Sequence, residues 1–251
     1  MKNKGKIHVI TKYFIPVVAG IEVNILETYS VLAKEGWDIT IHTSKDTYLQ
    51  KGHLADTDEV RGLKIVRYPF RWYGFSPKID WTEKTLVALH NFDIFPHLQI
   101  MVKTLFLKLL GKKQYKLFLT PHGGYNPEWS IFSSLSALIK RTYTYTLGTW
   151  LINSSVDGVR AVSDWENAEM KKKGIKRSLI TTIANGLEDD AFLSDDKKVL
   201  SGGFVVNSST VTFYTVSNYP SAENAWTASV HRSSTSTPWD MSVYAICANT
   251  N

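Results

Sequence analysis

A histidine followed by two glycines is the residue group best suited to chemistry in this sequence. His122, Gly123 and Gly124 occur in the segment LTPHGG, directly after an apolar run at residues 116–120 that predicts a buried strand. In α/β sheets, ligands bind at the carboxyl ends of the strands. The two glycines leave the loop free to fold over a ligand. We interpret His122 as the candidate catalytic residue; the alternative is a histidine hydrogen-bonded within a turn.

A second polar group stands at the end of another apolar run. The segment LHNFDIFPH contains His90 and Asn91 near a predicted strand end, and we expect both side chains to face the cleft. His97, at the far end of the same segment, is interpreted as structural or exposed. The sequence thus predicts polar side chains from two strand ends around one ligand, with Gly123 and Gly124 beside them.

The loop YFIPVVAGIEVN, between the first strand and the first helix, is a third candidate. A helix N-terminus presents free N–H groups and the positive end of the helix dipole, which suits a phosphate. Gly20 would let the backbone approach a ligand closely, and Glu22 and Asn24 follow as further substrate-binding candidates. The alternative is an ordinary loop whose glycine serves turn geometry alone.

Several other chemistries lack their motifs. The dinucleotide fingerprint G-x-G-x-x-G and the P-loop G-x-x-x-x-G-K are absent, which argues against NAD binding and ATP hydrolysis. The histidines are scattered, with no H-x-x-x-H or C-x-x-C pair, so no protein-held metal and no cofactor are expected. No G-x-S-x-G elbow supports a hydrolase nucleophile.

The elements that must position these residues alternate between strands and helices. Strands are predicted at residues 6–11, 37–43, 63–68, 116–120, 157–162 and 179–184. Helices are predicted at residues 21–35, 93–111, 129–152 with a break at Gly148, and 163–174. Ser163, with Glu166 three residues later, predicts a capping box at the start of the last helix. This alternation predicts an α/β domain with a parallel sheet and right-handed crossovers.

The chain changes character after about residue 193. Residues 193–203 are polar and contain glycine, and we interpret them as a linker. Residues 204–251 are predicted to form a small β-rich segment, with turns at NYPSAEN and SSTSTP. Between residues 201 and 251 there are 17 serines and threonines and no helical period, which separates this stretch from the α/β part.

Composition and charge narrow the class of protein. The chain has 251 residues and a formal net charge of +6, so a basic face could meet phosphates, acidic lipid or nucleic acid. Its single cysteine, Cys247, permits no internal disulfide. The start lacks a signal peptide, and the apolar run at residues 98–110 is too short to span a bilayer, so we expect a cytoplasmic protein. Peripheral contact with the inner membrane face through that run and Lys112-Lys113 stays open.

Six ordered segments together resemble one family. They are YFIPVVAGIEVN, SVLAKEGWDITIHTS, LHNFDIFPH, LTPHGG, VRAVSDWENAEMKKKGI and IANGLEDDAF. Their order and spacing over residues 5–192 resemble the family 4 retaining glycosyltransferases of the two-lobed GT-B type. The resemblance implies that residues 1–192 are the N-terminal Rossmann-like lobe of such an enzyme. The predicted fold class is therefore a Rossmann-like parallel sheet flanked by helices, followed by a small all-β segment.

The resemblance also implies roles for single residues. The loop ending at Gly20 would lie under the donor phosphates or beside the acceptor, and His122 would face the donor sugar. Asn185-Gly186 would be the crossover into a second lobe. The chain departs from the family pattern at Ala19, where a second glycine is usual, and at Asn24, where a histidine is common.

The larger departure begins after Phe192. The family's second lobe should start at this point and carry the basic residues that neutralise the donor diphosphate. The tail instead resembles a short Ser- and Thr-rich β module of secreted bacterial proteins. We therefore expect a glycosyltransferase of polysaccharide biosynthesis by family, truncated and inactive alone. Its expected partners are a nucleotide sugar donor, only with a complete second lobe, and a glycan or lipid-linked acceptor.

Two other functions remain as alternatives. A non-catalytic glycan-binding module could use either the lobe or the tail, where Trp226 and Trp239 could stack on sugars. Tryptophan in a small β module is more often part of the core. Nucleic-acid binding rests on net charge alone and is not expected.

Overall fold

The structure is a computed structural model of the chain. It describes side chains in residues 4–47, 50–71, 74–92, 95–125 and 133–185, and the backbone of four strands between residues 198 and 248. Internal contacts divide the chain into two compact units. The first comprises Met1–Val17 and Thr28–Asn185, and the second comprises Val18–Glu27 and Gly186–Asn251.

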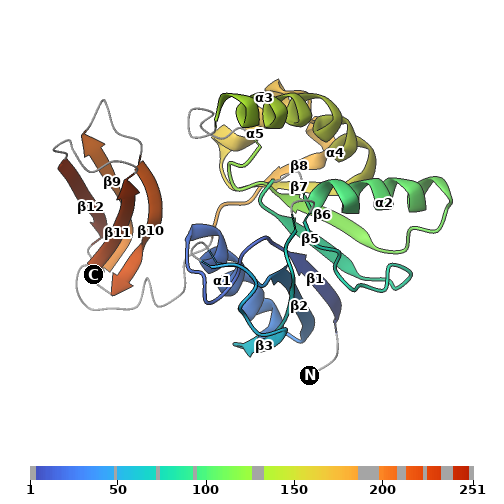
Figure 1. Ribbon diagram of the computed structural model, residues 1–251, viewed down its shortest axis with the longest axis horizontal. Coiled ribbons are helices and arrows are strands. Elements are labelled where there is room, and N and C mark those ends of the chain that lie inside the picture. The colour runs from blue at the N-terminus through green and yellow to red at the C-terminus, as the bar shows by residue number, and fades with distance from the viewer. Residues whose placement is uncertain are drawn as a thin grey trace. The chain divides into compact units, whose positions relative to one another are not determined.

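An eight-stranded sheet forms the centre of the first unit (Figure 1). Its strands are β1 (Gly5–Ile10), β2 (Trp37–Ser44), β3 (Thr57–Val60), β4 (Leu63–Tyr68), β5 (Leu86–His90), β6 (Lys116–Thr120), β7 (Gly158–Ala161) and β8 (Ile180–Thr182). They lie in the order β3-β4-β2-β1-β5-β6-β7-β8. All neighbours are parallel except β3 and β4. The predicted Rossmann-like α/β sheet is thereby confirmed.

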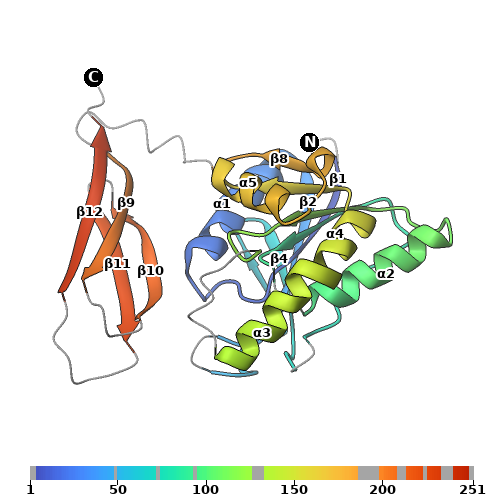
Figure 2. The same ribbon diagram turned by 90° about the horizontal axis from the view of Figure 1, so that it is seen from above.

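Helices connect the parallel strands. They are α1 (Gly20–Lys34), α2 (His97–Leu109), α3 (Ser134–Tyr143), a π-helical turn (Thr144–Gly148), α4 (Thr149–Ser155) and α5 (Asp164–Lys172), with a 3-10 turn at Arg177–Leu179. Helix α1 leads from β1 to β2, whereas α2 and α4 lead toward the other edge of the sheet. Right-handed crossovers in opposite directions place helices on opposite faces. The half of α1 from Thr28 onward thus lies across the sheet from α2 and α4 (Figures 1 and 2).

Buried apolar side chains fill both sides of the central strands, as parallel sheets require. The core includes Ile10, Val87, Leu89, Leu117, Leu119, Met101, Leu151 and Ile152, each at most 1% exposed. These residues come from strands β1, β5 and β6 and from helices α2 and α4. The strand ends between those elements are therefore held rigidly, which positions the residues that follow them.

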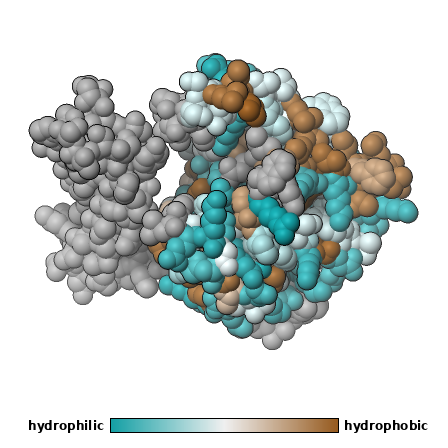
Figure 3. Space-filling view, in the orientation of Figure 1, coloured by the Kyte–Doolittle hydropathy of each residue, from teal (hydrophilic) through white to brown (hydrophobic). Residues whose placement is uncertain are grey.

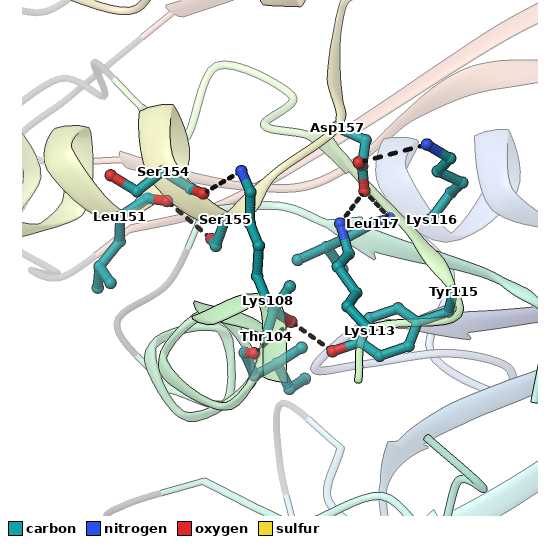
Figure 4. Close-up of polar contacts among 11 residues, drawn as sticks. Thr104, Lys108, Lys113, Tyr115, Lys116, Leu117, Leu151, Ser154, Ser155 and Asp157 are labelled. Carbon is teal, nitrogen blue, oxygen red and sulfur yellow. Dashed lines mark hydrogen bonds and ion pairs between the residues drawn. The ribbon is translucent and has the colours of Figure 1, made fainter. Parts of the chain in front are cut away.

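Polar contacts fix α2 against α4 and β6 (Figure 4). Lys108 Nζ donates to the backbone carbonyl of Ser154 at 2.9 Å, so a cation meets the C-terminal end of α4. Thr104 Oγ1 and Tyr115 Oη are 2.7 Å apart under the same helix. Asp157 forms an ion pair with Lys113 and accepts the Leu117 N–H at 2.8 Å. Together these contacts attach α2 to α4 and to the segment that leads into β6.

Some parts of the first unit differ from the sequence prediction, and one predicted part lies outside the described residues. Helix α3 begins at Ser134, and the predicted helix start at residues 129–132 lies outside the described residues. The break predicted at Gly148 is a π-helical turn that ends there, where a side chain would meet the Tyr143 carbonyl oxygen and the Phe92 ring. Strand β3 was not predicted because TDEV is polar and exposed, and only antiparallel pairing with β4 defines it.

The second unit contains four strands after residue 197, namely β9 (Lys198–Asn207), β10 (Phe213–Ala222), β11 (Ala225–Arg232) and β12 (Asp240–Ala248). They form two antiparallel pairs, β10-β11 and β12-β9, which agrees with the predicted all-β segment. The turn predicted from NYPSAEN is wrong for residues 218–222, which continue β10 with a bulge between Pro220 and Ala222. Strand β9 begins at Lys198, inside the stretch interpreted as a linker.

Among the described residues, none of the helices is both long and apolar enough to cross a membrane.

Candidate functional site

The chain reverses direction across the sheet between β1 and β5. Strands β2, β3 and β4 extend the sheet on one side of β1, and β5 to β8 extend it on the other side. The carboxyl ends of β1 and β5 therefore border the crevice where α/β proteins bind ligands. His90 is the last residue of β5 and pairs with Thr120, the last residue of β6. The predicted groups around His90 and His122 accordingly meet at this edge.

His90 and His122 are in direct contact. Their rings are stacked with centroids 5.1 Å apart, and His90 Nδ1 lies 2.9 Å from His122 Nε2. On the other side of His90, its Nε2 lies 2.8 Å from the hydroxyl oxygen of Tyr29 on α1. His90 is 1% exposed, whereas His122 is partly exposed. His90 thus lies behind His122 and supports it from within the protein.

Strained backbone occurs at both strand ends. Asn91 has a φ of 66° and His122 a φ of 51°, a region that residues other than glycine rarely adopt. Such strain persists only where surrounding contacts impose it, and it is common at functional sites. The Asn91 side chain accepts the Phe92 N–H at 2.8 Å. A side chain at Gly124 would collide with Asn91 Oδ1 and the Pro121 carbonyl oxygen, so the two loops touch directly.

Glu166 holds the loop that carries His122. The Glu166 side chain is 3% exposed, and its Oε1 accepts the Gly123 N–H at 2.6 Å. Its Oε2 accepts the Val162 N–H at 2.8 Å. Ser163 Oγ accepts the Glu166 N–H at 3.1 Å, which is one half of the predicted capping box. The other half is wrong, because the carboxylate binds Val162 and Gly123 in place of Ser163.

The electrostatics around the histidines disfavour an imidazolium. Burial, together with the positive charge of Arg160, lowers the pKa of His122 to about 4. Burial lowers the pKa of His90 well below its ordinary value, and His122 and Arg160 add to this effect. The Arg160 guanidinium donates to the carbonyl oxygens of Ile183 and Ala184, each at 3.0 Å. Both histidines are therefore neutral at physiological pH.

Gly20, Glu22 and Asn24 belong to the second compact unit. Gly20 opens α1, and a side chain there would meet no atom within 4 Å. Glu22 and Asn24 are 4% and 8% exposed, and burial raises the pKa of Glu22. Glu22 Oε2 and Asn24 Oδ1 have no hydrogen-bond partner among the described residues. Their participation in a site with His90 and His122 stays a prediction.

Three residues around His122 were not identified as site residues from sequence. Tyr29 resembled any apolar position of an amphipathic helix. Arg160 lies in a short strand and is one of many basic residues in the chain. Glu166 carried a signal as a capping residue, but its contact with Gly123 spans 43 positions and could not be read from local spacing. His97, expected to be structural or exposed, is fully buried, and its Nε2 lies 3.2 Å from the His90 carbonyl oxygen.

Within the described part of the chain, no group of three or more His, Cys, Asp or Glu side chains is arranged to hold a metal ion.

Comparison with known proteins gives a family match. The family model described as Glycosyltransferase Family 4 matches residues 18–191, which is more than half of the chain. None of the curated proteins compared with the sequence matches it.

Some solved structures align with part of the chain. HepE from Anabaena, in complex with UDP and glucose, aligns with 74% of this chain and 46% of its own, at 13% identity and a TM-score of 0.47. The same protein in complex with UDP-glucose aligns with 74% of this chain and 45% of its own, at 11% identity and a TM-score of 0.46. An alpha,alpha-trehalose 6-phosphate synthase from Burkholderia multivorans aligns with 68% of this chain and 42% of its own, at 10% identity and a TM-score of 0.38. This chain spans less than half the length of each of these structures.

Proposed function

This chain belongs to Glycosyltransferase Family 4, and we propose that it binds a glycan or lipid-linked acceptor at the edge formed by β1, β5 and β6. The observation that carries the proposal is the contact between His90 and His122 at the reversal point of the sheet. Strained backbone at Asn91 and His122 supports it, since the surrounding packing holds both residues in place. His122 is the side chain proposed to meet the sugar.

Asn91, Gly123 and Gly124 are proposed to shape the same binding surface. A glycine at position 123 has a φ of 77° and space beside its Cα, so a ligand can approach the backbone closely. The Gly20 loop, with Glu22 and Asn24, is proposed to meet the donor phosphates or the acceptor from the start of α1. A nucleotide sugar is the proposed donor, and UDP-glucose, which is present with HepE, is the first donor to test.

The chain alone is proposed to bind sugar without transferring it. Departure of a nucleoside diphosphate needs fixed positive charge around the leaving group. Arg160 is the cation whose positive charge lowers the pKa of both His90 and His122, and one positive charge does not balance the negative charge of a leaving diphosphate. Strands β9 to β12 contain no α/β unit that could supply a second nucleotide-binding lobe. Complete transfer would therefore need a further lobe.

A glycan array separates binding by the lobe from binding by the tail. We expect the full chain to bind a subset of glycans, and His122→Ala to weaken that binding roughly 3- to 10-fold, the worth of one hydrogen bond. Trp226→Ala is the matched control in the β-strands and should leave binding unchanged. The opposite pattern, loss with Trp226→Ala alone, would place recognition in the tail and contradict the proposal.

We propose that the outer sides of α2 and α3 contact the inner face of a membrane peripherally. This contact would hold the proposed binding site close to that face. The side of α2 opposite the core is apolar and exposed, and α3 carries a second apolar stripe (Figure 3). The exposed residues are Val102, Phe106 and Leu109 on α2, Leu110 directly after it, and Leu135, Leu138 and Ile139 on α3. Contiguous exposed apolar residues on a protein surface can mark an interaction surface.

Charge favours an anionic lipid surface as the partner of these helices. Residues 97–116 and 133–157 contain seven lysines and arginines and one acidic residue, Asp157, which pairs with Lys113 and Lys116. The basic residues are Lys103, Lys108, Lys112, Lys113, Lys116, Lys140 and Arg141. Exposed apolar residues with flanking cations are typical of helices that lie in a membrane interface. A lipid-linked acceptor would be reached from such a position.

A further inference from the structure

Tyr29, His90 and His122, named here the Tyr29 triad, form a continuous hydrogen-bonded series. The hydroxyl oxygen of Tyr29 is 2.8 Å from His90 Nε2, and His90 Nδ1 is 2.9 Å from His122 Nε2. One proton lies in each of these two contacts, because a neutral imidazole has one N–H and one bare nitrogen. The tautomers of the two histidines are therefore coupled, and the direction of the series decides which nitrogen of His122 carries its proton.

The series has two possible directions. In the first, Tyr29 donates to His90 Nε2, His90 Nδ1–H donates to His122 Nε2, and His122 carries its proton on Nδ1. In the second, His122 Nε2–H donates to His90 Nδ1, and His90 Nε2–H donates to the Tyr29 oxygen. The second direction leaves His122 Nδ1 bare and requires another acceptor for the Tyr29 hydroxyl proton.

The surroundings of Tyr29 favour the first direction. Tyr29 is 8% exposed, and the described residues give its hydroxyl no hydrogen-bond partner other than His90. A buried hydroxyl proton without an acceptor is costly, so the second direction is disfavoured. In the first direction both contacts of the triad are satisfied and no buried proton is left over. The triad is thus asymmetric because it ends in a tyrosine.

We infer that Tyr29 is a positioning residue that holds His122 as the Nδ1–H tautomer, so that His122 offers a ligand a hydrogen-bond donor and not a base. The mechanistic meaning of this inference rests on the proposed function, whereas the tautomer itself does not. The ligand group that fits is an oxygen acceptor, such as a sugar hydroxyl or ring oxygen.

Charge around the triad acts in the same sense. The positive charge of Arg160 and burial both oppose a second proton on either histidine, which lowers the pKa of His122 and of His90. Neutral rings are what the series requires, because an imidazolium at His90 would have no bare nitrogen to accept from Tyr29. His122 accordingly acts as a neutral donor across the physiological pH range.

Nitrogen NMR of the full chain with ¹⁵N-labelled histidine tests the inference directly. The chain has seven histidines, and the ring signals of His122 are identified as those that disappear in His122→Gln. At pH 7.5 we expect His122 to show a protonated Nδ1 and a bare Nε2. In Tyr29→Phe the two directions become similar in energy, so the ratio of the two tautomers at His122 should fall about tenfold or more. A bare Nδ1 in the unchanged chain, or an unaltered ratio in Tyr29→Phe, would overturn the inference.

A second tyrosine series supplies the matched control. Tyr68 Oη is 2.9 Å from His42 Nδ1, and His42 Nε2 is 3.0 Å from His8 Nδ1. Tyr68→Phe should change the His42 and His8 signals and leave His122 as it was. Unchanged His42 and His8 signals in Tyr29→Phe show that this variant is folded. If Tyr29→Phe does not fold, the tautomer of His122 in the unchanged chain still decides the inference.

The measurement is independent of sugar transfer. A wrong proposed function would appear as an absence of glycan binding while the His122 tautomer stays as inferred. A wrong inference would appear in the spectrum of the free chain, whether or not the chain binds sugar.

Discussion

At the scale of single residues, the site depends on contacts between side chains far apart in the sequence. His122 is held on one side by His90 and Tyr29, and its loop is held on the other side by Glu166. Each supporting group is buried, so none can move without leaving a buried polar atom unpaired. The strained φ of His122 is tolerated because these contacts fix it from both directions.

Glu166→Gln tests the support beneath His122. The carboxylate accepts two backbone N–H groups, and glutamine offers one oxygen and an NH₂ group that faces a donor. We expect the free energy of unfolding, measured with urea, to fall by about 1–3 kcal/mol. Glu59→Gln, at an exposed residue of β3, is the control and should cost less than about 0.5 kcal/mol. Equal effects of the two changes would contradict this account of Glu166.

The buried histidines predict a loss of stability in mild acid. Burial lowers the pKa of His42 to about 3, and the charge of a protonated His8 would add to this. At pH values above its ordinary pKa, His42 is neutral in both the folded and the unfolded chain, so it causes no loss of stability there. As the pH falls below about 6.5, only the unfolded chain takes up the proton, and stability decreases by up to about 1.4 kcal/mol per pH unit.

Urea unfolding at pH 7.5 and pH 5.0 measures this loss. In His42→Gln the difference between the two pH values should shrink by up to about 2 kcal/mol, because one proton-binding group of the unfolded chain is gone. His53→Gln, at an exposed histidine, should leave the difference unchanged. The same pH dependence in His42→Gln as in the unchanged chain would show that His42 is not held neutral by the fold.

At the scale of elements, sequence periodicity predicts most of the sheet because the buried positions of its strands are occupied largely by apolar residues. Residues 63–68 and 116–120 are examples, and β4 and β6 have these bounds. The π-helical turn at Thr144–Gly148 and the bulged strand β10 were beyond prediction, because packing around Gly148 and pairing with β11 decide them. In the site, His90 and His122 could be predicted because each lies at the end of a predicted strand. Tyr29 and Glu166 could not, because only the three-dimensional fold brings them next to these histidines.

The exposed apolar residues of α2 and α3, with the cations beside them, predict that the chain binds anionic vesicles. We expect the full chain to sediment with vesicles of phosphatidylcholine and phosphatidylglycerol, and much less with phosphatidylcholine alone. Phe106→Glu places a charge on the exposed apolar side of α2 and should lower the bound fraction at least about tenfold. Trp165→Glu, at an exposed apolar residue of α5, is the matched control and should have little effect. Equal sedimentation with both vesicle types would contradict the charge-based argument.

At the scale of the whole molecule, the chain joins an α/β unit of Glycosyltransferase Family 4 to strands of a different kind. The family match ends at residue 191, and the described strands after it begin at Lys198. The first unit offers a partly exposed histidine, His122, with a neutral ring, and one nearby cation, Arg160, whose charge lowers the pKa of that histidine. The central claim of the proposed function is that the chain binds sugar, and that its described residues supply too little positive charge to release a nucleoside diphosphate.

A transfer assay with radiolabelled UDP-glucose, UDP-galactose and GDP-mannose tests that claim most directly. Each donor is incubated with the full chain and the glycans that the chain binds, and both the labelled product and the released nucleoside diphosphate are measured. We predict no transfer above the level of a His122→Ala control with any donor. Multiple-turnover transfer that is abolished in His122→Ala would contradict the claim, because it would show that this chain alone stabilises the leaving diphosphate.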